Sequence, residues 1–247
     1  MRILILSDIH ANSTALEAAL SVTEGRWERA VCLGDVVGYG PDPNEVIDRI
    51  RGLQAATIRG NHDKAACGIA DAEDFNPVAR AAAAWTQEHL RADNLSFLQQ
   101  LPQGPLTIDG LVLVHGALHD EDEYVFAPAQ ALDGLLESPA AVTFFGHTHF
   151  QGGFSFRDNK LEVIQLRPEP GANFAALRIE PNIRYLLNPG SIGQPRDGDP
   201  RAAFAIADMA LAVVEFWRVP YDVESVQLRM ERAGLPEPLI LRLAFGR

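Results

Sequence analysis

The feature that most constrains the fold is a short apolar segment that ends directly in polar residues able to bind a metal. Residues 1–7 form a near-continuous apolar run, and Asp8 and His10 follow it at once. Such a run is typical of a buried central strand. Because side chains alternate along a strand, we expect Asp8 and His10 to point the same way. A carboxylate beside an imidazole suits a divalent metal such as manganese, iron or zinc.

The same order of strand, polar loop and helix then occurs twice more. Residues 30–33 are apolar and end in Gly34 and Asp35, and residues 55–58 end in a loop that carries Asn61. Asn12 or Ser13 can cap the first helix, over residues 15–20, and the second helix spans 45–51. This alternation predicts parallel strands with crossover helices. Sites in such sheets lie at the carboxyl ends of the strands.

The rest of the chain predicts a helix pair, a hairpin and a series of strands. Residues 77–101 are Ala-rich and helical, and Asp109-Gly110 joins two apolar runs as a hairpin turn. Further elements are expected as a helix over 129–136, a strand over 141–145, antiparallel strands at 153–156, 161–166, 175–179, 184–187, 203–207 and 213–218, and a final helix over 222–232. We expect one domain, residues 1–247, in which the strands after 150 form a second sheet against the first. The alternative is a domain boundary near residue 150.

Charge and length limit the classes of function. The chain has 247 residues, 47% of them hydrophobic, and this is enough for one large core. Its formal net charge of -12 disfavours general nucleic-acid binding, because such a surface repels a phosphate backbone. A phosphate substrate remains compatible with this charge, because bound metal ions can dominate the field inside a site. The oligomeric state stays open.

The cysteines and the hydropathy pattern favour a cytoplasmic protein. Cys32 and Cys67 are the two cysteines, and they form no Cys-x-x-Cys motif. We expect both to be buried thiols in a reducing compartment. The N-terminal apolar run is too short for a signal peptide, and no stretch is long enough to span a membrane, so no membrane partner is expected.

Candidate metal ligands gather at the ends of five predicted strands. They are Asp8, His10, Asp35, Asn61, His115, His147 and His149. Seven ligands are too many for one tetrahedral ion but suit two ions that share a bridging carboxylate. Metal pairs of this kind stabilise both the attacking and the leaving oxygen of an in-line displacement.

These motifs together resemble the calcineurin-like metallophosphoesterases, in particular their compact bacterial and archaeal members. The matching motifs, in chain order, are Asp8-x-His10, Gly34-Asp35-x-x-Gly38, Gly60-Asn61-His62-Asp63, His115 and Gly146-His147-x-His149. The resemblance implies an α/β fold, a four-layer α/β/β/α sandwich of two mixed β-sheets flanked by helices.

The resemblance also implies a role for each motif residue. Asp8, His10 and His149 would bind the first ion, Asn61, His115 and His147 the second, and Asp35 would bridge them. His62 would stabilise the transition state or protonate the leaving oxygen, with Asp63 orienting it; the alternative is that His62 only supports the site. The cofactor would be two divalent metal ions, with manganese favoured and iron, zinc or nickel as alternatives.

The activity expected from this resemblance is hydrolysis of a phosphomonoester or phosphodiester through in-line attack of a metal-bridging hydroxide. The substrate would be a small or medium phosphoester. The alternative is a catalytically silent metal-binding scaffold or interaction protein, such as a retromer subunit with the same fold. The Asp-Arg-Gly of the family's protein phosphatases and symmetrical dinucleoside tetraphosphatases is replaced here by Gly38-Tyr39-Gly40, which puts those two activities in doubt.

Four further features concern substrate and surface. Arg196 either meets a substrate phosphate or only belongs to a tight turn, and Asn12 and Tyr39 are weaker candidates for substrate binding. The acidic run 120–123 is expected to be a solvated loop, with a third metal site as the alternative. If this loop overhangs the site, it favours small phosphoesters over polyanions. His89 and His119 are expected at the surface.

Overall fold

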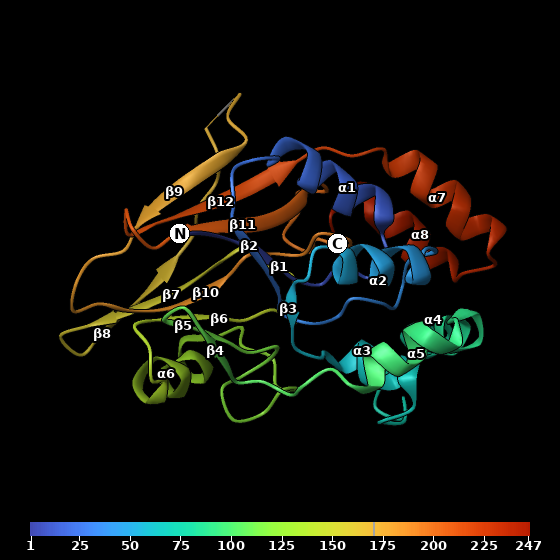
Figure 1. Cartoon of the computed structure of the whole chain (residues 1–247), viewed down its shortest axis with the longest axis horizontal. Coiled ribbons are helices and arrows are strands. Elements are labelled where there is room, and N and C mark those ends of the chain that lie inside the picture. The colour runs from blue at the N-terminus through green and yellow to red at the C-terminus, as the bar shows by residue number, and fades with distance from the viewer. Residues whose placement is uncertain (170) are drawn as a thin grey trace.

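The computed structural model describes residues 1–169 and 171–247, in which two six-stranded sheets pack face to face (Figure 1). The first sheet has the order β3–β2–β1–β11–β12–β9, with bounds β1 Arg2–Leu6, β2 Arg29–Cys32, β3 Ala56–Thr57, β9 Phe174–Arg178, β11 Ala202–Asp208 and β12 Val213–Val219. The strands β1, β2 and β3 pair in parallel, and β11, β12 and β9 continue the sheet antiparallel.

The second sheet is also mixed. Its order is β4–β5–β6–β10–β7–β8, with bounds β4 Leu106–Ile108, β5 Leu111–Leu113, β6 Val142–Phe144, β7 Gly152–Arg157, β8 Lys160–Ile164 and β10 Arg184–Asn188. Strands β5, β6 and β10 are parallel, and the hairpins β4–β5 and β7–β8 close the two edges. The helices are α1 Ser13–Val22, α2 Pro43–Gly52, α3 Asn61–Cys67, α4 Pro77–His89, α5 Ala92–Gln99, α6 Pro128–Glu137, α7 Val223–Arg232 and α8 Glu237–Arg242, and a 3₁₀ turn follows at Leu243–Phe245.

Strand β1 shows why its sequence is apolar at every position. Ile3 and Ile5 face the second sheet, where they join Phe144 in the core between the sheets. Leu4 and Leu6 face the opposite way and pack under α1 and α2. Since both faces of the strand are covered, neither can carry a polar side chain without leaving it unsolvated.

The second sheet follows the same rule. Leu113 points into the core between the sheets, whereas Val112 and Val114 pack with Leu135 of α6 on the outer face. Helices therefore cover the outer faces of both sheets, α1 and α2 on one side and α6 on the other (Figure 1). This arrangement confirms the four-layer sandwich.

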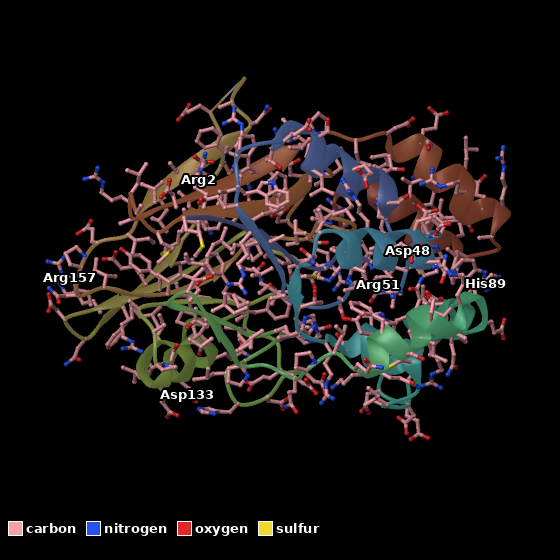
Figure 2. The ribbon with its side chains drawn as sticks, in the orientation of Figure 1. Arg2, Asp48, Arg51, His89, Asp133 and Arg157 are labelled. Atoms are coloured by element: carbon pink, nitrogen blue, oxygen red, sulfur yellow. The ribbon has the colours of Figure 1, made fainter. Side chains whose placement is uncertain are left out.

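Charged pairs join the helices at the surface (Figure 2). Arg51 of α2 donates to Asp93 of α5 at 3.0 Å, and Asp48 accepts from Arg91 at 2.7 Å. Such exposed pairs contribute at most about 1 kcal/mol each. His89 lies nearby at the end of α4, exposed as expected for a surface histidine.

One expectation about the sheets is wrong. The strands after residue 150 do not form a second sheet of their own, because β9, β11 and β12 extend the first sheet while β7, β8 and β10 extend the second. Periodicity predicts that a strand exists, but partner choice depends on contacts distant in sequence. Helix α8 was also missed, since Pro236 and Pro238 at its start looked like loop residues.

The core between the sheets predicts a large stability effect. Phe144 is fully buried between the two sheets, so Phe144→Ala removes its contacts and leaves a cavity. We expect the free energy of unfolding, measured by urea titration, to fall by about 3–5 kcal/mol. The control Val163→Ala truncates an exposed side chain of β8. It should change the free energy of unfolding by about 0.5 kcal/mol or less. Equal losses in the two variants would contradict this packing.

Candidate metal centre

Loops at the carboxyl ends of five strands meet at one point. Backbone hydrogen bonds tie the loops after β1 and β2 together, from Asp8 N to Gly34 O at 3.1 Å and from His10 N to Asp35 O at 3.0 Å. The loops after β5 and β6 are joined in the same way, from Gly146 N to His115 O at 2.8 Å. The site therefore rests on the strand ends of both sheets.

Most of the candidate ligands have left-handed backbone conformations. The φ angles are +50° at Asp8, +49° at His10, +52° at Asp35, +65° at His147 and +62° at His149. Such angles are uncommon outside glycine and cluster at functional sites. We expected strand alternation to align Asp8 with His10, and this is wrong because β1 ends at Leu6. The two side chains point inward because the loop after the strand turns them.

Two glycines make room for the ligands. A Cβ at Gly60 would collide with the Asp35 carboxylate and with the His115 ring. A Cβ at Gly146 would strike the Ser7 hydroxyl, which donates to Asp8 Oδ2 at 2.6 Å. These close approaches explain why Gly-Asn-His-Asp and Gly-His-x-His begin with glycine.

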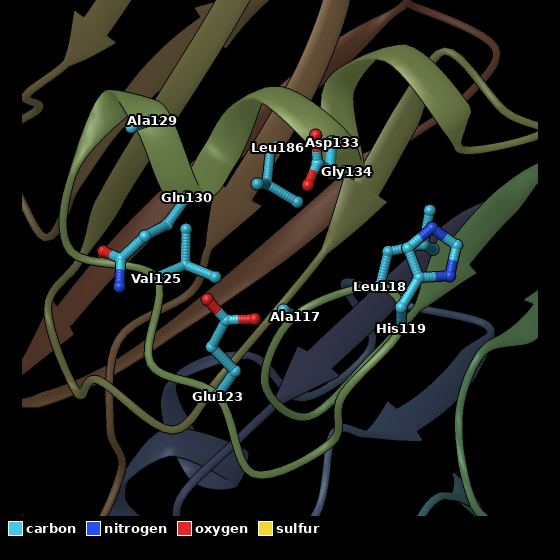
Figure 3. A pocket seen from close by; sticks show the side chains of 10 residues that line it. All are labelled: Ala117, Leu118, His119, Glu123, Val125, Ala129, Gln130, Asp133, Gly134 and Leu186. Atoms are coloured by element: carbon cyan, nitrogen blue, oxygen red, sulfur yellow. The ribbon is translucent and has the colours of Figure 1, made fainter.

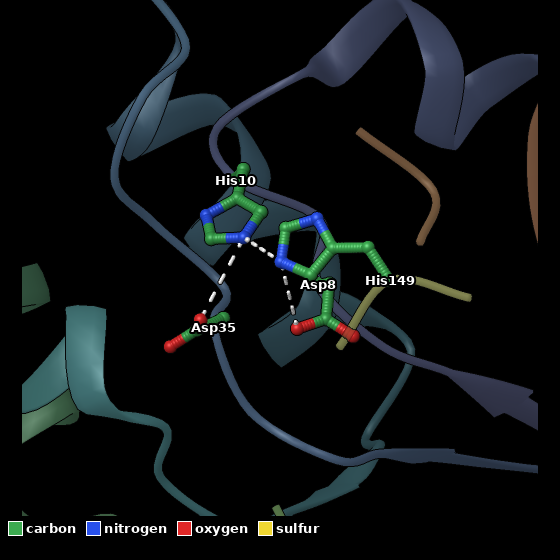
Figure 4. A group of neighbouring side chains, drawn as sticks. All are labelled: Asp8, His10, Asp35 and His149. Atoms are coloured by element: carbon green, nitrogen blue, oxygen red, sulfur yellow. Dashed lines mark hydrogen bonds and ion pairs between the residues drawn. The ribbon is translucent and has the colours of Figure 1, made fainter. Parts of the chain in front are cut away.

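The first cluster comprises Asp8, His10, Asp35 and His149, all buried, with their ligand atoms within 4.8 Å of one another (Figure 4). His149 Nε2 lies 3.1 Å from His10 Nε2 and 3.4 Å from Asp8 Oδ1, and His10 Nε2 lies 3.6 Å from Asp35 Oδ2. Ligands about 2.1 Å from a tetrahedral ion are about 3.4 Å apart, so these spacings fit one ion.

The second cluster comprises Asp35, His115 and His147, again within 4.8 Å. His115 Nε2 lies 3.5 Å from Asp35 Oδ2 and 3.2 Å from Asn61 Oδ1. The structure thus brings together all seven residues that the sequence predicts as ligands, and Asp35 belongs to both clusters.

Backbone carbonyls fix the orientation of the imidazoles. The Nδ1 atoms of His10, His115 and His149 lie 3.1, 2.8 and 2.6 Å from the carbonyl oxygens of Val37, Leu33 and Gln194. A proton on Nδ1 leaves Nε2 with a free lone pair toward the cluster. His147 is turned the other way, since its Nε2 lies 3.0 Å from Asp122 O.

Burial sets the charge of the site. It lowers the pKa of His10 and His149 well below the usual value, and the pKa of His147 to about 3, which keeps these rings neutral and able to ligate a metal. Burial opposes a charge on His115 as well, but Asp35 outweighs it and raises this pKa to about 9. His115 in turn holds the pKa of Asp35 well below its ordinary value against the effect of burial.

His62 and Asp63 do not interact as we expected. The Asp63 carboxylate accepts from the backbone N–H groups of Gly60 at 3.0 Å and Val37 at 3.1 Å, so it shapes the loops and does not orient His62. His62 lies against the rings of Tyr39 and Phe75, its Nδ1 is buried without a hydrogen-bond partner, and burial lowers its pKa to about 4. Its backbone N–H donates to Asp35 Oδ1 at 2.9 Å.

The two predicted substrate residues differ. Arg196 is half-buried; its Nη2 donates to Gln194 Oε1 at 3.0 Å and approaches Tyr39 OH at 3.3 Å, while its Nε is buried without a partner. Asn12 is 1% exposed, caps α1 by accepting from Ala15 N and donates to Gly193 O, both at 3.0 Å. Asn12 therefore has a structural role, and its contact with substrate stays a prediction.

In the loop between β5 and α6, residues 114–127, the acidic run is solvated as expected at Asp120, Asp122 and Glu123, but Glu121 is held against the protein. Glu121 is 10% exposed and accepts from Arg59 at 2.8 Å and Lys64 at 2.9 Å, and Lys64 also donates to Asp122 at 2.6 Å. Tyr124 stacks on the His147 ring at 3.7 Å. We missed this contact because a tyrosine in an acidic stretch carries no ligand signal of its own.

A separate pocket of about 270 Å³ lies between this loop and α6 (Figure 3). His119 and Glu123 line it, but none of the candidate ligands does. His119 is 64% exposed and lies 2.7 Å from Glu137 on α6, as a surface histidine would. Among the described residues, every helix is too short or too polar to cross a membrane, and Cys32 and Cys67 are buried free thiols, as expected.

Comparison with known proteins gives the class of the chain. Residues 1–211 match the family model of the calcineurin-like phosphoesterase superfamily domain, so the chain belongs to that superfamily. A metallophosphoesterase from Sphaerobacter thermophilus is 40% identical with a TM-score of 0.82, over 100% of this chain and 99% of that one.

Two archaeal proteins are similar over nearly their whole length. The uncharacterized protein MJ0912 of Methanocaldococcus jannaschii is 31% identical over 99% of this chain and 98% of its own. The hypothetical protein PH1004 of Pyrococcus horikoshii OT3 has a TM-score of 0.78 at 22% identity, over 100% of this chain and 98% of that one, a likeness of fold.

Gly60 provides a test of how tightly the loops pack. Gly60→Ala pushes a methyl group onto Asp35 and His115, so we expect fewer bound metal ions per chain, measured by mass spectrometry after dialysis against manganese. The control is Gly52→Ala, at the last residue of α2, where an added Cβ meets nothing within 4 Å. This variant should keep the wild-type metal content. Full metal loading in Gly60→Ala would contradict the proposed crowding.

The Glu121 contacts predict a pH-dependent stability. Burial alone would raise the pKa of Glu121, but Arg59 and Lys64 outweigh it and lower this pKa below the ordinary 4.5. The stabilisation is therefore complete above pH 4.5 and is lost as the pH falls through the lower, folded-state pKa. We expect Glu121→Gln to lower the free energy of unfolding by about 2 kcal/mol at pH 7 and by less in acid.

The matched control for this variant is Glu162→Gln on the exposed strand β8. The free energy of unfolding of both variants would be measured by urea titration at several pH values between 3 and 8. If Glu121→Gln lowers the free energy of unfolding by the same amount across this pH range, the charge of Glu121 is not what stabilises the fold.

Proposed function

We propose that this protein hydrolyses small or medium phosphoesters, monoesters or diesters, by in-line displacement at a centre of two divalent metal ions. The observation that carries the proposal is the position of Asp35, one carboxylate within reach of two separate groups of buried ligand atoms. A shared carboxylate of this kind is what a pair of ions requires. The family supports a phosphoesterase role in general terms.

The residues present fit such a pair. Asp8, His10 and His149 would hold one ion, Asn61, His115 and His147 the other, and Asp35 both. When bound, the metals supply Lewis acidity and lower the pKa of water. Nitrogen and oxygen ligands suit manganese, which we favour, as well as iron, zinc and nickel.

The chain's own groups provide substrate binding and hydrogen bonds. Arg196 carries an unpartnered buried Nε beside the cluster, and we assign it to a substrate phosphate oxygen. His62 is neutral at pH 7, so one ring nitrogen carries an N–H that can donate a hydrogen bond to a substrate oxygen and stabilise the transition state. The acidic β5–α6 loop lies beside the cluster, since Asp122 O is 3.0 Å from His147 Nε2, and together with the net charge of -12 it favours small substrates over nucleic acid.

The proposal predicts different losses at Asp35 and His62. With manganese-loaded protein, we expect hydrolysis of bis-p-nitrophenyl phosphate, p-nitrophenyl phosphate or both. Asp35→Asn should lose metal and activity together, whereas His62→Ala should keep both ions and lose about 10²–10³-fold in kcat. Metal content is measured on the same samples.

The control is Leu211→Ala in the turn between β11 and β12, at the strand ends opposite the site, which should leave both rates unchanged. Two bound ions without turnover of either ester, under manganese, iron, zinc or nickel, would support the metal-binding scaffold instead.

A further inference from the structure

An exposed group of aromatic side chains borders the candidate metal centre. Among the described residues, four of the large exposed apolar side chains are aromatic, and three of these lie together: Tyr124, Phe126 and Phe150, with exposed fractions of 39%, 56% and 45%. The Tyr124 and Phe126 rings are 5.3 Å apart and nearly parallel at 10°, and Phe126 and Phe150 are 5.9 Å apart at 90°. Clustered exposed aromatics mark binding sites, whereas single ones need no explanation.

This aromatic corner is continuous with the metal site at both ends. Tyr124 stacks on the His147 ring at 3.7 Å, so His147, Tyr124 and Phe126 form one ladder of rings. Phe150 follows the candidate ligand His149 directly in sequence. A group held in the corner would therefore be one short linker away from a phosphate at the metals.

The backbone holds the corner in place. Phe126 N and Ala127 N both donate to Gln130 Oε1 at 2.9 Å, which fixes Phe126 at the start of α6. Thr148, two residues before Phe150, is buried and accepts from Asn188 at 2.9 Å. Because the two rings stand on anchored segments, little ordering would oppose the binding of a flat ligand.

We infer that Phe126 and Phe150 bind the base of a nucleotide substrate whose phosphate lies at the metal centre. The perpendicular rings form a corner that offers one face for stacking and one for an edge contact, the two arrangements that aromatic groups favour. Every base has a π-face, so this surface selects for a base without dictating which one. The inference rests on the proposed function for the position of the phosphate.

The groove beyond Phe150 suits the polar edge of a base held in the corner. Phe150 also lines a cavity of about 620 Å³ together with Gln165 and Arg167. These side chains offer amide and guanidinium groups to polar substituents.

The test compares adenosine 5′-monophosphate with ribose 5-phosphate, which differ only in the base. Binding is measured by calorimetry on manganese-loaded protein in a His62→Ala background, and kcat/KM is measured in the wild type. For diesters, the p-nitrophenyl ester of thymidine 5′-monophosphate is compared with methyl p-nitrophenyl phosphate. We expect the affinity and kcat/KM to be about 10-fold or more higher for the nucleotide than for the ligand without a base.

Phe126→Ala and Phe150→Ala should each remove most of this preference while leaving ribose 5-phosphate unchanged, and Leu211→Ala should keep it. Equal binding of the two ligands by the unmutated corner would overturn the inference. The inference would also be overturned if the two phenylalanine variants kept the preference for the nucleotide but changed from dimer to monomer in light scattering. The corner would then be a contact between two copies of the chain. Preferential binding without any hydrolysis would support the corner and reject the proposed activity.

Discussion

The structure of the site depends on one buried carboxylate, that of Asp35. It accepts the backbone N–H of His62 and lies 3.5–3.6 Å from imidazoles on two different loops. An isolated buried charge would be strongly unfavourable, and this one is offset by the hydrogen bond and by the proton on His115. In the metal centre that we propose, ligation by His115 would require that proton to leave, so ion binding and proton release would be coupled at this residue.

The sequence predicts which candidate ligands lie together far better than it predicts their geometry. Asp8 and His10 were recognised because polar residues follow an apolar run, and that signal is local. Their conformation is not local, since the left-handed turns are fixed by hydrogen bonds to the loop after β2. Alternation along a strand was the wrong reason for a correct grouping.

Partner choice between polar groups was the other limit of the sequence. Asp63 stands beside His62 in sequence, yet its carboxylate binds the backbone of Gly60 and Val37. Asn12 could serve either as a helix cap or as a substrate contact, and only the fold shows that its amide oxygen caps α1 while its nitrogen donates to Gly193. The same limit applies to the strands after residue 150, whose apolar pattern fits either sheet.

The left-handed angles at the ligands restrict which residues can replace them. Asparagine, aspartate, histidine and glycine accept φ near +50°, whereas β-branched residues do not. At Asp8 or Asp35, asparagine would remove the charge and keep the turn, while valine or threonine would distort the loop and the strand end it leaves. Variants designed to alter metal preference can therefore use only a few residue types at these positions. New donor side chains are better introduced at Asn61, in the regular first turn of α3.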